Sequence, residues 1–152
     1  NKGLIAKIDA KSLEVINTWE LTDRLNWLDP VCFDGTYLWV GDLSDLGIHR
    51  YILKDDEAIH TGTLRYPKEM HFSQGIRVRG NRLYSIHTFG TMDGLFEFTL
   101  PTELTETPVI PTTVWRIPEL FSHAEGFAFV PGKENEVWHA QVRHVERIKL
   151  AR

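Results

Sequence analysis

The sequence has little cysteine, little excess charge and no long apolar run. Its 152 residues include a single cysteine, Cys32, which excludes an internal disulfide. Cys32 falls in a predicted strand, so we interpret it as a small buried apolar residue and not as a nucleophile. The net charge of −4 comes from 17 basic and 21 acidic residues, which are interleaved along the chain. Nucleic acid is therefore not expected as a partner, and without an apolar run of bilayer length no membrane span is expected.

Common enzyme motifs are also missing from the sequence. It contains no Gly-rich phosphate loop, no GxSxG nucleophile elbow, no HExxH and no CxxC. Covalent hydrolase chemistry and dinucleotide chemistry are therefore unsupported. Nothing in the sequence indicates a cellular compartment.

What the sequence does contain is a pattern that recurs three times. Three segments align on an aromatic residue: Leu28–Asp42, Ser73–His87 and Ala124–Gln141. Each has a polar residue followed by Pro or Gly, an alternating apolar run, a Gly-containing turn and a second apolar run. Positions 29, 74 and 125 match, so the spacings are about 45 and about 51 residues. One four-stranded propeller blade has a period of this size.

The third and fourth strands of each unit recur as well. Apolar and polar residues alternate with a period of two, bounded by Gly, Pro, Asn and Asp, which is a strand signal. Third strands are predicted at Ile48–Leu53, Leu95–Leu100, Val145–Leu150 and Leu4–Asp9, and fourth strands at Ile16–Leu21, His60–Pro67 and Thr112–Pro118. No stretch has a convincing helical period, so the sequence predicts an all-β fold.

These segments resemble part of a β-propeller, of the broad kind that includes YncE-like, NHL-type and SMP-30/gluconolactonase-like proteins. The resemblance covers nearly the whole chain and implies a single propeller segment over residues 1–152, with about three four-stranded antiparallel blades. We expect a half blade in 1–21, blades in 28–67 and 72–118, and a partial blade in 123–150. Propellers close with about four to eight blades. Completion is therefore expected from further blades of the same precursor, from another chain or from a second copy.

The first strand of a propeller blade lines the central channel, so functional residues are expected at its entrance. Asp29, Gln74 and Glu125 match there, and Asp42, His87 and Gln141 match at the end of the second strand. The candidate ligand-binding residues are Trp27, Asp29, His71, Gln74, His87, His123 and Gln141. The structural alternative is that polar residues at blade starts hold the blades together by forming hydrogen bonds with neighbouring backbone groups.

A metal ion is the other possibility at this entrance. The Glu125-Gly126 pair resembles the metal-binding glutamate position of SMP-30-like lactonases. Together with the entrance histidines His71 and His123, Glu125 makes up the candidate metal set. Oxygen-rich ligand sets suit calcium, and histidine with carboxylate suits zinc. Two functions follow as hypotheses: a binding module that holds a small ligand or partner protein at the channel face, or a metal-dependent hydrolase or lactonase.

Residues outside this entrance are interpreted as structural. His49, His60 and His144 fall on predicted outer strands or turns and are expected to be exposed. Four tryptophans match across the units and are expected to pack in the core between blades: Trp19, Trp39, Trp115 and Trp138.

Overall fold

The computed structural model describes residues 3–23, 25–88, 94–116, 124–141 and 145–151. Over these ranges the chain is all-β, with one short 3₁₀ helix, η1 (Lys68–Met70). That helix is three residues long, and no helix in the described ranges is long and apolar enough to cross a membrane. The strands are β1 (Leu4–Ile8), β2 (Val15–Leu21), β3 (Leu28–Phe33), β4 (Tyr37–Asp42), β5 (Gly47–Lys54), β6 (Glu57–Arg65), β7 (Phe72–Arg79), β8 (Arg82–Thr88), β9 (Gly94–Thr99), β10 (Thr113–Trp115), β11 (Ala124–Phe129), β12 (Glu136–Gln141) and β13 (Val145–Lys149).

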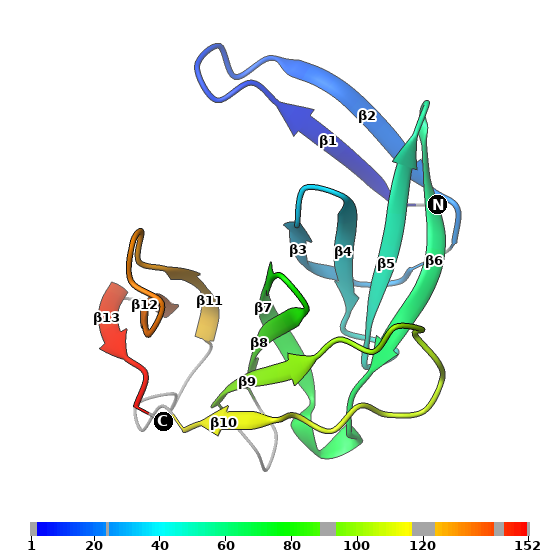
Figure 1. Cartoon of the computed structure of the whole chain (residues 1–152). Coiled ribbons are helices and arrows are strands. Elements are labelled where there is room, and N and C mark those ends of the chain that lie inside the picture. Colours follow the sequence, from blue (N-terminus) through cyan, green and yellow to red (C-terminus); the bar gives the residue numbers. More distant parts are fainter. Residues whose placement is uncertain (1–2, 24, 89–93, 117–123, 142–144, 152) are drawn as a thin grey trace.

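Consecutive strands pair antiparallel in three meanders (Figure 1). The first meander is β3–β6, the second is β7–β10 and the third is β11–β13. Tight polar turns join the strands. Between β3 and β4 the Asp34 carboxylate accepts the backbone N–H groups of Thr36 and Tyr37 at 2.8 and 2.7 Å and the Trp39 indole N–H at 2.7 Å. The predicted strands of residues 28–67 therefore form as four neighbouring strands.

The N-terminal hairpin β1–β2 extends the first sheet in an unexpected way. Its turn is held by the Asp9 carboxylate, which accepts the backbone N–H groups of Lys11 and Ser12. β2 then pairs parallel with β6 over only two residue pairs, which gives a six-stranded sheet in the order β1-β2-β6-β5-β4-β3. The sequence predicted the hairpin itself but not this parallel junction.

The apolar core lies between the sheets in three clusters. One cluster joins the first and second meanders around Trp39, Ile76 and Phe96. A second joins the second and third meanders, and a third lies between the β1–β2 hairpin and the first meander. The second meander is covered on both faces, and β4 contributes Trp39 to the first cluster and Leu38 and Val40 to the third, which explains why β4, β8 and β9 are almost completely buried.

The first strands of the three meanders lie next to one another (Figure 1). β7 contacts β3 on one side and β11 on the other. The approach of β7 to β11 is close enough to require glycine, because a Cβ added to Gly75 would lie 3.1 Å from the Cα of Gly126. The backbones of two strands about fifty residues apart therefore meet almost directly.

The tryptophans divide by the face they occupy. Trp39 and Trp115 are buried, and Trp19 packs at the edge of the core between the hairpin and the first meander. The prediction for Trp138 is wrong, since its side chain is 43% exposed. Its neighbours Val137 and His139 face the core, so alternation along β12 turns Trp138 to the outer face of the third meander.

Candidate functional site

The first strands of the three meanders share one irregularity at their beginning. In each, the pairing with the second strand shifts by one residue: between Leu28 and Val31 in β3, between Ser73 and Gly75 in β7, and between Ala124 and Gly126 in β11. The bulged positions include Asp29, Gln74 and Glu125, the three polar residues that the sequence aligns. A β-bulge bends its strand and re-aims a side chain, and bulges are common beside functional sites.

The residues across from these bulges are also equivalent. Asp42 pairs with the residue before the bulge in β3, His87 occupies this place in the second meander, and Gln141 occupies it in the third. The second set of residues matched in the sequence is thus found opposite the first, at the same end of each meander.

Two carboxylates, one from the first meander and one from the third, lie at this end. Asp29 is partly buried and Glu125 is exposed. Burial raises the pKa of Asp29, and the negative charge of Glu125 raises this pKa further. The first and third meanders therefore bring two acidic groups into electrostatic contact, a place suited to a cation or a cationic group of a ligand.

Trp27 borders the same end of the first meander. Its side chain is 63% exposed, and its backbone N–H donates to the Asp42 carboxylate at 3.3 Å. Asp42 also accepts the backbone N–H groups of Asn26 and Ser44 and the Ser44 hydroxyl. Burial raises the pKa of Asp42, but these hydrogen bonds outweigh it and hold the pKa below its usual value. Asp42 thus fixes the loop that presents Trp27, as the structural alternative expects.

His87 lies beneath the end of the meanders at which Asp29, Glu125 and Trp27 are found. Its side chain is completely buried, its ring packs edge-on against Tyr66 and Phe96, and its Nδ1 donates to the carbonyl oxygen of His71 at 3.2 Å. Burial lowers the pKa of His87 to about 4, so the ring is neutral at pH 7. The geometry gives His87 a role in packing under the site.

The other predicted residues vary in accessibility. His71 is exposed and ends η1 with a positive φ of 51°, while Gln74 and Gln141 are half-buried. His123 lies outside the described residues. The predicted metal set of Glu125, His71 and His123 can therefore be described only in part.

A second polar cluster, which the sequence analysis missed, lies on β5 and β6. His49 and His60 were expected to be exposed, but His49 is 5% exposed and His60 is half-buried. His49 Nε2 lies 3.1 Å from Asp45 Oδ2, its Nδ1 lies 3.1 Å from Thr63 Oγ1, and His60 Nε2 lies 3.0 Å from the same Oγ1. His60 Nδ1 lies 3.2 Å from Asp23 Oδ2.

The cluster is partly buried, with His49 and Tyr51 covered and His60 and Asp23 each about one-third exposed. Burial lowers the pKa of His60, although the charge of Asp23 opposes this shift. Burial, followed by the charge of Asp23, raises the pKa of Tyr51, whose ring lies 5.4 Å from that of His60. A usable signal existed in the sequence: His49 and Tyr51 are two residues apart on one strand and so share a face. The sheet order that buries this face beneath the hairpin was not predictable from alternation alone.

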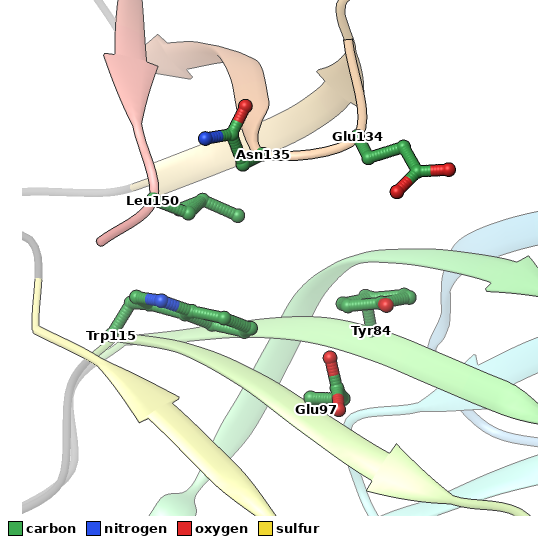
Figure 2. Close-up of a pocket in the computed structure, with 6 residues that line it drawn as sticks. All are labelled: Tyr84, Glu97, Trp115, Glu134, Asn135 and Leu150. Atoms are coloured by element: carbon green, nitrogen blue, oxygen red, sulfur yellow. The ribbon is translucent and has the colours of Figure 1, made fainter. Parts of the chain in front are cut away.

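A pocket of about 410 Å³ lies elsewhere, between the second and third meanders (Figure 2). Trp115, Tyr84 and Glu97 line one side, and Leu150, Asn135 and Glu134 line the other. The pocket combines aromatic rings with carboxylates, but it contains none of the candidate ligand-binding or metal-binding residues predicted from the sequence.

The chain matches no protein-family model and no curated protein, so the functional argument rests on the geometry above.

Proposed function

We propose that the chain forms part of a β-propeller. Three consecutive antiparallel meanders pack face to face, and their first strands adjoin. The equivalent bulges at the start of β3, β7 and β11 support a common structural unit. In this architecture the adjoining first strands surround the propeller axis.

We also propose that further blades complete this propeller, supplied by the same precursor, another chain or a second copy. The support is the apolar surface of the hairpin, where five large apolar side chains are exposed: Leu4, Ile8, Leu13, Val15 and Ile16. Exposed apolar patches and free sheet edges favour association. Light scattering of the isolated chain is expected to give a mass that grows with concentration. A stable monomer over a wide concentration range would contradict this proposal.

The function that the geometry supports best is that of a binding module. We infer that it holds a small ligand or a protein side chain with a cationic group at the common end of β3, β7 and β11. The observation that carries this proposal is that equivalent bulges place Asp29 in β3 and Glu125 in β11 at the same end of the meanders. Burial and then the charge of Glu125 raise the pKa of Asp29, in agreement with this placement. A cation would relieve this repulsion, and the exposed ring of Trp27 offers a face for a cation–π contact.

Argininamide is a suitable probe, because its guanidinium can bind two carboxylates. Isothermal titration calorimetry is expected to give saturable binding to the wild-type chain. Asp29→Asn and Glu125→Gln should each weaken it about tenfold, since a hydrogen bond to a charged group is worth about 1.5–3 kcal/mol. Trp27→Ala should weaken it less.

The matched control is Glu134→Gln, which changes an exposed glutamate in the Figure 2 pocket. Binding should be unchanged in this variant. If Glu134→Gln loses argininamide binding and Glu125→Gln keeps it, the ligand binds in the pocket of Figure 2 and the proposed site is wrong.

The second candidate function is a metal-dependent hydrolase or lactonase. The paired carboxylates of Asp29 and Glu125 favour it, because oxygen ligands suit calcium and a bound cation can activate water or polarise a carbonyl. Hydrolysis of the lactone dihydrocoumarin that requires added calcium, and that is lost in Glu125→Gln, would support this function over the binding module. Argininamide binding without any calcium-dependent hydrolysis would reject it.

A further inference from the structure

Three side chains from separate segments converge at the junction of the hairpin with the first meander. Asp23 lies two residues after the end of β2, His49 lies on β5 and His60 lies on β6. One ligand atom from each of the three lies within 4.8 Å of the others. Neutral imidazole and carboxylate are the ligands that zinc and related transition metals prefer.

Counting protons along the hydrogen-bond chain leaves one position for a cation. A neutral imidazole has one N–H and one bare nitrogen, and a hydroxyl has one proton to donate. Thr63 Oγ1 lies between His49 Nδ1 and His60 Nε2, so it can donate to only one of them, and the other must donate to it. The histidine that donates to Thr63 then presents its bare nitrogen to a carboxylate: His49 to Asp45, or His60 to Asp23.

The Asp23 side of this chain is the one that needs a cation. Asp45 already forms an ion pair with Arg65, in which Asp45 Oδ2 lies 2.8 Å from Arg65 Nη1. Among the residues that the structure describes, the ion pair of Asp23 is with His60. Two acceptor atoms facing each other at 3.2 Å repel unless a second proton on the imidazole or a metal ion lies between them.

The buried hydroxyl of Tyr51 belongs to the same group of side chains, because burial and then the charge of Asp23 raise its pKa. Tyr51 is completely buried, and its hydroxyl has no hydrogen-bond partner within the described ranges. Its ring lies 5.4 Å from that of His60 and 6.5 Å from that of His49. A buried hydroxyl without a partner costs free energy, and such groups call for an ion or a bound water nearby.

The neighbouring acidic group is less suitable. Asp42, Asp45 and His49 also lie within ligand distance of one another. However, both Asp42 oxygens accept hydrogen bonds, and Asp45 is paired with Arg65. The group of Asp23, His49 and His60 is therefore the better cation site.

We propose that Asp23, His49 and His60 bind a divalent transition metal, with zinc as the best fit. With His60 Nδ1 on the ion, its Nε2–H would donate to Thr63. With His49 Nδ1 on the ion in place of its contact with Thr63, its Nε2–H would donate to Asp45. Such outer contacts orient metal-bound histidines in proteins. Because Asp23 follows β2 and both histidines lie on the first meander, the ion fastens the hairpin to that meander. This site shares no residue with the proposed ligand site, so either proposal can fail alone.

Zinc binding to the chelator-treated full chain tests the proposal. Isothermal titration calorimetry with zinc chloride is expected to give one site per chain. Asp23→Asn and His60→Ala should each weaken binding at least about tenfold, while Asp56→Asn, which neutralises an exposed carboxylate outside the site, should leave it unchanged. Zinc should also raise the unfolding temperature of the wild type, because it binds only the folded state.

A wild-type measurement keeps the test independent of variant folding. Zinc should shift the ring NMR signals of His49 and His60 and leave those of His71 in place. The proposal is overturned if the wild type shows no saturable zinc binding, or if the His71 ring shifts while those of His49 and His60 do not. Zinc binding lost in Glu125→Gln but kept in Asp23→Asn would also overturn it.

Discussion

Acidification should destabilise this protein through one buried histidine, His87. The ring is completely buried, so protonation would place a charge against Tyr66 and Phe96. Burial lowers the pKa of His87 from 6.5 to about 4. The native state therefore binds fewer protons than the unfolded state between these values, and stability rises with pH in this range. The contribution is complete above pH 6.5 and is lost as the pH falls toward 4.

The size of this effect follows from the two pKa values. One unit of pKa difference corresponds to about 1.4 kcal/mol, so the loss is about 2 kcal/mol by pH 5 and about 3 kcal/mol near pH 4. A small protein loses about 1–3 kcal/mol of stability per molar urea. The urea midpoint should therefore fall by about 1 M between pH 7.5 and pH 5 from this residue alone.

Urea unfolding followed by tryptophan fluorescence measures the effect at several pH values. The matched variant is His87→Phe, which keeps an aromatic ring but cannot titrate. It loses the hydrogen bond to the His71 carbonyl and should be less stable at pH 7.5. Other titrating groups are common to both proteins, so the stability difference isolates His87. A difference that stays constant from pH 7.5 to pH 4.5 would refute the reasoning.

Three further outcomes are expected. Gly75→Ala should destabilise the fold by about 1–3 kcal/mol in urea unfolding, because the added Cβ would meet the backbone of Gly126. The Cβ added in Gly126→Ala meets nothing within 4 Å, so this variant should change stability by less than about 0.5 kcal/mol. Equal effects of the two variants would contradict the close approach of β7 and β11. Thr63→Val should cost about 1–3 kcal/mol, since it removes the hydroxyl between two buried ring nitrogens, and an unchanged urea midpoint would argue against that hydrogen-bond chain. Glu125→Gln should lower the pKa of Asp29 in a carbon-13 NMR titration, and an unaltered titration curve would separate the two carboxylates.

The sequence predicted local structure well because local structure depends on alternation and turns. The strands of residues 28–67 were expected and form, and the matched positions 29, 74 and 125 coincide with the bulges in β3, β7 and β11. Alternation does not report which sheet covers which face. Trp138 was therefore predicted to be buried although no described element covers its side of the third meander, and the parallel pairing of β2 with β6 was not foreseen.

The two candidate sites also differ in how far the sequence predicted them. Spacing alone brought out Asp29 and Glu125, because each begins an equivalent strand. The site of Asp23, His49 and His60 has no such spacing, since its residues come from a loop and two strands that meet only after the hairpin docks. Such a site is created by tertiary contacts, and a single sequence carries no pattern that announces it.

The junction of β2 with β6 divides the six-stranded sheet into two parts that differ in dynamics. Only two residue pairs cross it, whereas the β5–β6 ladder runs along the whole length of both strands. Local opening requires less free energy where fewer backbone hydrogen bonds and buried contacts must break. We therefore expect the amide protons of β1 and β2 to exchange with deuterium through a detachment that leaves β3–β6 folded, so that the hairpin opens as a separate cooperative segment of one continuous sheet.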